Sequence, residues 1–183
     1  MKTLTVREIA YIAMGAALIA VCSWISIPMT IPVTLQTFAV CLVTAVFGLR
    51  MGLWTVLIYI LLGAVGVPVF SGFSGGIGIL LGTTGGYIVG FLFTALAVGL
   101  AVGRWGRSIP VLAASMAVGI LLCYAFGTAW FMIVYTKNSG AIGLMTALGW
   151  CVFPYLIPDA VKIALATVLT GRLAPLVGKG LEK

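Results

Sequence analysis

Long apolar runs recur along the whole chain, and they limit its possible folds more than any other feature. Of its 183 residues, 63% are hydrophobic and 7% are charged, whereas a soluble domain carries about 25% charged residues. So few charges cannot cover a water-exposed surface. Runs long enough to cross a bilayer are typical of transmembrane helices. The sequence therefore predicts an all-α integral membrane protein in which residues 1–183 form a single membrane domain.

The apolar runs divide into six predicted transmembrane helices. These are Ile9–Ile27, Leu35–Leu49, Leu53–Phe70, Gly86–Gly103, Ile109–Tyr135 and Leu156–Ala174. The region 138–155 is also apolar, and we interpret it as a short outer helix or a re-entrant segment. A seventh span there would export the basic residues of the C-terminus, against the preference of Lys and Arg for the cytoplasmic side.

The basic residues agree with six spans and with both termini in the cytoplasm. Eight of the ten then fall on the cytoplasmic side: Lys2, Arg7, Arg50, Arg104, Arg107, Arg172, Lys179 and Lys183. Orientation in a lipid membrane therefore accounts for the net charge of +7, and nucleic-acid binding is not indicated.

Three segments fall on the outer side in this topology: 28–36, 71–84 and 136–157. They are nearly uncharged, and two of them are too apolar for ordinary water-exposed loops. Irregular backbone at membrane depth is tolerated only where protein buries it or where it lines a hydrated cavity. We expect these outer loops to fold over a shared, outward-facing ligand cavity.

The residue inventory excludes several kinds of function. The chain has no histidine, which removes the commonest general base and metal ligand. Residues 72–76 match the G-x-S-x-G pattern of serine hydrolases, but the Ser-His-Asp triad requires a histidine. The four cysteines are widely separated, and no P-loop motif occurs. The sequence predicts no enzyme, no metal site and no cofactor.

Two charged residues stand in the segment PYLIPDAVKIAL (154–165), where the last predicted span begins. Asp159 and Lys162 are three residues apart and therefore share a helix face. In one interpretation, Asp159 stabilises the helix N-terminus and Lys162 extends outward to the membrane interface. In the other they contact a ligand, since a charge near the bilayer centre costs about 2.5–3.5 kcal/mol. The pair suits a small ligand with N–H donors and an anionic group.

Polar residues also interrupt apolar sequence at 31–38. Thr34 and Gln36 follow Pro28 and Pro32, and the prolines favour an extended link over continuous helix. In such a link, Thr34 and Gln36 share a face. They either face a ligand or belong to a polar interfacial loop.

The first predicted span is rich in alanine. Ala13 with Ala17, and Ala16 with Ala20, form small-xxx-small pairs, which allow helices to approach closely. The pairs pack either inside the protein's own bundle or against another membrane subunit.

Four segments together resemble the BioY family: VTLQTFAV (33–40), GVPVF (66–70), GTTGGYIVGF (82–91) and PDAVKIALA (158–166). The resemblance covers essentially the full length of the chain. Thr83 departs from it, since the family usually has proline before TGGY. The BioY family comprises the substrate-binding S components of biotin transporters of the energy-coupling factor (ECF) type.

The resemblance implies the six-helix ECF S-component fold, with biotin captured at the outer face. It implies a multi-pass protein of the prokaryotic plasma membrane. The alanines of the first span would dock a transmembrane coupling (T) subunit that carries two cytoplasmic ATPase subunits. An S component for another vitamin and a stand-alone secondary transporter of biotin remain alternatives.

The chemistry of the residues fits biotin independently of the resemblance. Asp159 would accept hydrogen bonds from the ureido N–H groups of biotin, and Lys162 would pair with its carboxylate. Tyr87 would cover the apolar rings. Further ligand contacts are expected from Thr34 and Gln36, from the backbone of Gly75, Gly85 and Gly86, which lack a Cβ, and from Ser74.

Overall fold

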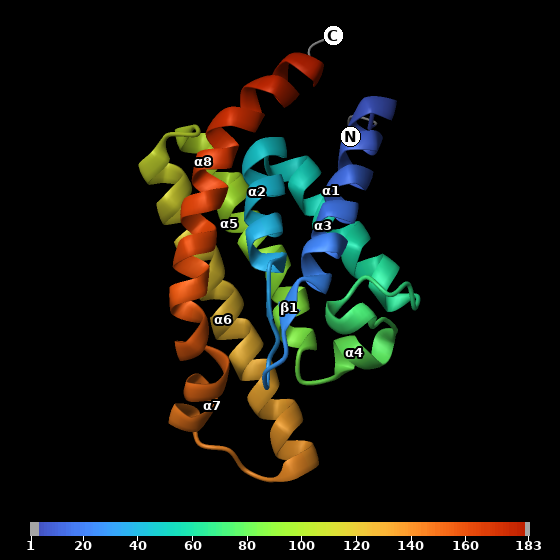
Figure 1. The fold of residues 1–183 in the computed structure, drawn as a ribbon, viewed down its shortest axis with the longest axis vertical. Helices are drawn as coiled ribbons and strands as arrows, with labels where there is room; N and C mark the ends of the chain where they lie inside the picture. The colour runs from blue at the N-terminus through green and yellow to red at the C-terminus, as the bar shows by residue number, and fades with distance from the viewer. Residues whose placement is uncertain (1–3, 182–183) are drawn as a thin grey trace.

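The computed structural model describes residues 4–181 as a bundle of apolar helices (Figure 1). The six principal helices are α1 (Val6–Trp24), α2 (Gln36–Phe47), α3 (Leu49–Ala64), α5 (Gly85–Trp105), α6 (Ile109–Ser139) and α8 (Leu156–Leu181). The connections contain the strands β1 (Ser26–Ile27) and β2 (Val33–Thr34), the single turns η1 (Ser71–Phe73) and η2 (Phe153–Tyr155), and the short helices α4 (Ile77–Leu81) and α7 (Leu144–Cys151). The predicted six-helix, all-α architecture is confirmed.

Two of the six helices are shorter than predicted. In the described part of the chain, α1, α5, α6 and the stretch Leu144–Gly178 are long and apolar enough to cross a membrane, whereas α2 and α3 are shorter apolar helices. At 1.5 Å per residue, the 12 residues of α2 extend about 18 Å, less than the ~30 Å of a bilayer core. The predicted spans 35–49 and 53–70 therefore extend past the ends of these helices, which lie at Phe47 and Ala64.

The backbone explains these boundaries. Gly48 adopts a φ of 81° and forms the whole turn between α2 and α3, so Leu49 already belongs to α3. Helix α3 ends at Ala64, and Gly66 follows with a φ of 103°. Glycine readily adopts a positive φ, which allows the chain to leave the helix at both positions. The predicted spans did not end at either glycine.

The two ends of the bundle differ as predicted. The start of α1, the end of α8 and the α2–α3 and α5–α6 turns gather at one end, while β1, α4 and α7 lie toward the other (Figure 1). Arg107 links the basic turns, because its Nε donates to the Ala45 carbonyl at 2.8 Å and its Nη2 to that of Val46 at 3.2 Å. Lys2 and Lys183 lie outside the described residues. The chain is a multi-pass membrane protein.

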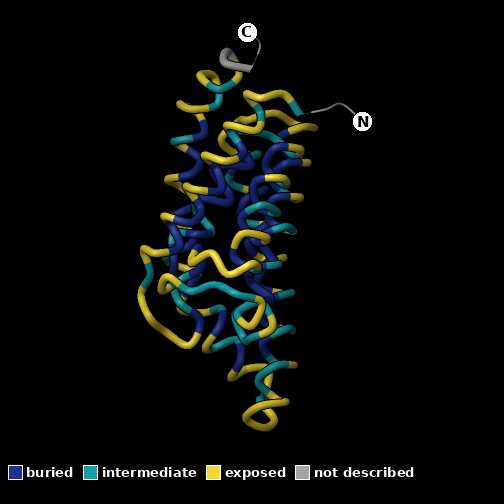
Figure 2. Tube along the Cα trace, turned by 90° about the vertical axis from the view of Figure 1, so that its right-hand side faces the viewer, coloured by how far each residue is buried: buried dark blue, intermediate teal, exposed yellow. Residues whose placement is uncertain are grey.

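Buried residues line the interior of the bundle, and exposed residues lie mainly on its outside (Figure 2). Small residues let α5 and α6 approach closely, and the Thr94 hydroxyl of α5 donates to the Gly119 carbonyl of α6 at 2.9 Å. A Cβ added at Gly90 would lie 2.8 Å from the Cys123 sulfur, and one at Gly127 would lie 2.4 Å from the Tyr87 ring. Glycine at these positions is therefore a packing requirement.

The alanine pairs of α1 divide between the two predicted roles. Ala16 and Ala20 are buried in the protein's own core, so the prediction that they dock a partner is wrong. Ala13 and Ala17 are exposed. Helix α1 turns one small face toward α3, where a Cβ at Gly15 would lie 2.8 Å from Thr55, and leaves the second alanine pair on the surface.

The turn after α3 yields a test of the packing. A Cβ at Gly63 would lie 2.0 Å from the Phe70 ring, so Gly63→Ala should destabilise the fold by about 1–3 kcal/mol through overpacking. We expect a lower thermal unfolding temperature in detergent. Gly103→Ala is the matched control, since a Cβ there meets nothing within 4 Å. Equal unfolding temperatures for the two variants would contradict the packing shown here.

Candidate ligand-binding site

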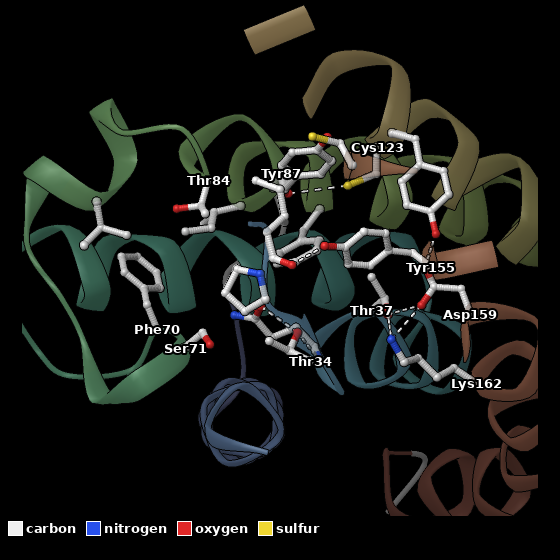
Figure 3. Close-up of a pocket in the computed structure, with 18 of the residues that line it drawn as sticks. Thr34, Thr37, Phe70, Ser71, Thr84, Tyr87, Cys123, Tyr155, Asp159 and Lys162 are labelled. Atoms are coloured by element: carbon white, nitrogen blue, oxygen red, sulfur yellow. Dashed lines mark hydrogen bonds and ion pairs between the residues drawn. The ribbon is translucent and has the colours of Figure 1, made fainter. Parts of the chain in front are cut away.

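A cavity of about 140 Å³ opens beneath the connection between α1 and α2. A single water needs about 10–15 Å³ by the same measure, so the cavity has room for a small organic molecule. Its walls come from segments far apart in the sequence: the hairpin and the start of α2, the stretch 70–74, α5, α6, η2 and the start of α8 (Figure 3). The predicted outer segments therefore do share one cavity.

Asp159 and Lys162 form a buried ion pair in the wall of this cavity. Lys162 Nζ lies 2.6 Å from Asp159 Oδ1, and both side chains line the cavity. Thr37 closes a triangle, because its hydroxyl donates to Asp159 Oδ1 at 3.1 Å and accepts from Lys162 Nζ at 3.2 Å (Figure 3). The second oxygen, Oδ2, accepts a hydrogen bond from the Tyr124 hydroxyl.

The cluster combines charges from α8 with hydroxyls from α2 and α6. Asp159 lies in the first turn of α8, where the helix dipole favours a negative charge. Lys162 does not extend outward to the interface, since only 6% of it is exposed. This excludes the anchoring role for the lysine. A buried ion pair needs further hydrogen bonds to offset its desolvation, and Thr37 and Tyr124 supply them.

Thr34 at the end of β2 and Gln36 at the start of α2 line the cavity and belong to a second polar network. The Thr34 hydroxyl donates to Gln36 Oε1 at 2.9 Å, and Gln36 Nε2 donates to the Tyr59 hydroxyl at 2.5 Å. Tyr59 in turn donates to the Val69 carbonyl at 3.1 Å. The network ties the start of α2 to α3 and to the segment that follows it. Both residues are buried, which excludes a water-exposed interfacial loop.

The connection between α1 and α2 forms the cover of the cavity. Residues 26–27 and 33–34 pair as antiparallel strands, and Ile31 and Pro32 between them line the cavity. The Tyr155 hydroxyl of η2 donates to the Ile31 carbonyl, so a side chain from the segment just before α8 holds the tip of this hairpin. Strand pairing therefore holds the base of this cover, and Tyr155 holds its tip.

Tyr87 and Ser74 also line the cavity. Tyr87 is part of the wall, since its hydroxyl lies 2.9 Å from Thr128 Oγ1 and the residue is buried. The Ser74 hydroxyl donates to the Ser71 carbonyl at 2.7 Å within its own loop. The structure thus brings both residues to the cavity, as the sequence analysis expected.

The three predicted glycines face the protein itself. A Cβ at Gly75 would lie 2.4 Å from the Val67 carbonyl oxygen, one at Gly85 would lie 1.8 Å from that of Leu80, and one at Gly86 would lie 2.3 Å from Trp130. Among the described residues, the lining of the cavity includes none of them. Close packing of loop and helix therefore requires glycine at these three positions, and the expected contact of their backbone with a ligand stays a prediction.

The comparisons with known proteins agree with this architecture. The sequence model of the BioY family matches residues 1–179. The chain belongs to the BioY family. It is 38% identical to the probable biotin transporter BioY of Pyrococcus horikoshii. The alignment of 168 residues covers 91% of this chain and 96% of that protein. The chain is 36% identical over 171 residues to the biotin transporter BioY of Thermotoga maritima, with 93% and 97% covered.

A solved structure has the same fold as this BioY chain. It is the crystal structure of the S-component for biotin from an ECF-type ABC transporter. The TM-score is 0.83 at 24% sequence identity, with 93% of this chain and 94% of that chain covered. The predicted family and the predicted S-component fold are both confirmed.

Sequence reasoning missed Tyr124 and Tyr155 and did not include Thr37 in the site. One signal was available: a tyrosine hydroxyl within an apolar span needs a hydrogen-bond partner, and Tyr124 stands inside the run GILLCYAFG (119–127). The sequence does not identify the partner. Only the fold places Asp159, 35 positions away, against this hydroxyl.

The ion pair yields a stability prediction for this BioY chain. Lys162→Met leaves the Asp159 carboxylate buried without its cation, which typically costs about 3–5 kcal/mol. We expect a clearly lower unfolding temperature in detergent without ligand. The double variant Asp159→Asn with Lys162→Met removes both charges and should recover part of that loss. If the single variant unfolds at the wild-type temperature, the pair does not contribute in the way its geometry indicates.

Proposed function

We propose that this chain is the biotin-binding S component of an ECF-type transporter. The observation that carries the proposal is a cavity with apolar walls and one buried charged cluster, Asp159 with Lys162, on a BioY-family fold. The Pyrococcus relative is named a probable biotin transporter, and the Thermotoga relative is named a biotin transporter. The function is binding and transport, and no enzyme activity is proposed.

The geometry of the pair changes the expected ligand assignment. The ureido ring and the carboxylate of biotin lie at opposite ends of the molecule. Because Lys162 Nζ is 2.6 Å from Asp159 Oδ1, the two residues meet the same end of an elongated ligand. A cyclic urea offers an N–H donor and a C=O acceptor side by side, which complements a carboxylate next to an ammonium. We therefore place the ureido ring at both residues, in place of a carboxylate at Lys162.

The remaining walls suit the rest of biotin. Phe70, Phe91 and Ile88 line the cavity with apolar surface, against which the sulfur-containing ring and the hydrocarbon chain can pack. Ser71 and Thr84 also line it and supply hydroxyl groups toward which a carboxylate can extend.

Partner subunits supply the energy in this proposal. The exposed pair Ala13 and Ala17 provides a flat surface for a transmembrane T subunit, which in turn binds two cytoplasmic ATPases. The basic end of the bundle, with Arg50, Arg104 and Arg107, lies in the cytoplasm of a prokaryotic cell, and the cavity faces outward across the cell membrane.

Calorimetric titration of the purified chain with biotin tests the binding site. Asp159→Asn replaces a charged acceptor and should weaken binding about 10- to 150-fold, the range for one hydrogen bond to a charged group. Glu8→Gln is the matched acid-to-amide control outside the cavity, and it should bind like the wild type. Unchanged affinity in Asp159→Asn would contradict the ureido assignment. Tighter binding of another vitamin by the wild type would favour an S component of different specificity.

The docking surface has a separate test. Ala13→Trp or Ala17→Trp should prevent co-purification with the T subunit and ATPases and abolish biotin uptake, while leaving biotin binding by the isolated chain intact. Ala125→Trp, at an exposed position of α6, is the control and should assemble normally. Uptake by proteoliposomes that contain this chain alone would favour a stand-alone secondary transporter instead.

A further inference from the structure

Tyr124 joins the charged cluster from a third helix, α6. It lies on α6, is buried, and lines the cavity. Its hydroxyl donates to Asp159 Oδ2, whereas Lys162 and Thr37 both bind Oδ1. The two carboxylate oxygens are therefore held by groups on different helices.

This division controls how the ion pair can rearrange. A lysine ammonium has three N–H donors, and here two of them are directed to Asp159 Oδ1 and Thr37 Oγ1. The electrostatic attraction between Lys162 and Asp159 favours turning Oδ2 toward the third donor as well. The Tyr124 hydroxyl opposes this rotation by holding Oδ2. The third N–H of Lys162 and the remaining lone pair of Oδ2 then stay available to a ligand.

We propose that Tyr124 is a positioning residue that makes the site specific for a cyclic urea. It holds Asp159 so that one carboxylate oxygen accepts a ligand N–H while Lys162 donates to the adjacent ligand carbonyl. Without the hydroxyl, Asp159 and Lys162 close on each other and withdraw both groups. This inference rests on the proposed binding of biotin, and it adds the residue through which the ureido ring is distinguished from other ligand ends.

A purely structural role for Tyr124 makes a different prediction. If the hydroxyl only stabilises the bundle, its loss should weaken all ligands of the cavity alike. If it positions Asp159, its loss should affect only ligands that carry the ureido group. A suitable probe is tetrahydrothiophene-2-pentanoic acid, which keeps the sulfur-containing ring and the carboxylate chain of biotin but lacks the ureido group.

The experiment compares Tyr124→Phe with wild type by titration with biotin and by competition with this probe. We expect biotin affinity to fall about 10-fold, the lower end of the range for one hydrogen bond to a charged group, while probe affinity stays unchanged. The ratio between the two ligands should therefore fall about 10-fold. Tyr135→Phe, on the same helix and outside the lining of the cavity, is the matched control and should keep the wild-type ratio.

A double variant keeps the inference falsifiable if Tyr124→Phe also lowers stability. Because Tyr124 acts through Asp159, adding Tyr124→Phe to Asp159→Asn should weaken biotin no further. Equal losses for biotin and probe, or additive losses in the double variant, would overturn the inference. A wild-type chain that does not bind biotin would instead contradict the proposed function, so the two failures are distinct.

Discussion

The ion pair between Asp159 and Lys162 is the interaction on which the rest of the structure depends. Each charge in a membrane interior is expensive, since insertion scales give about 2.5–3.5 kcal/mol for one such residue at a helix centre. The pair is tolerated because α8 brings the charges within 2.6 Å of each other and because α2 and α6 add the hydroxyls of Thr37 and Tyr124. Three helices must therefore meet at one point. The cavity opens where they meet, and both charged residues line it.

The cavity combines a polar end with apolar walls and a fastened cover. The Thr34–Gln36–Tyr59 network fixes the start of α2 to α3 and the segment after it, and Tyr155 holds the hairpin by the Ile31 carbonyl. Such a site suits a small ligand with one compact polar head, which biotin has in its ureido ring.

The sequence predicted best the transmembrane helices and the few charged residues that interrupt them. The spans follow from the apolar runs, their number follows from the positions of Arg and Lys, and Asp159 and Lys162 stand out as rare charges.

Properties that depend on neighbours were not predictable in this way. Gly85 and Gly86 lack a Cβ whether they face a ligand or, as here, Leu80 and Trp130. Ala13 and Ala16 are both alanines of one helix, and the packing of α2 and α3 against α1 leaves the first exposed and the second buried. Tyr124 needed the fold to bring it to Asp159.

We propose that this buried pair recognises the ureido ring. A structure of the purified chain with biotin bound tests it most directly. We expect the ureido oxygen within hydrogen-bond distance of Lys162 Nζ and a ureido nitrogen within the same distance of Asp159 Oδ2, with the carboxylate at the opposite end of the cavity. A carboxylate bound to Lys162, or a ureido ring that contacts neither residue, would contradict it.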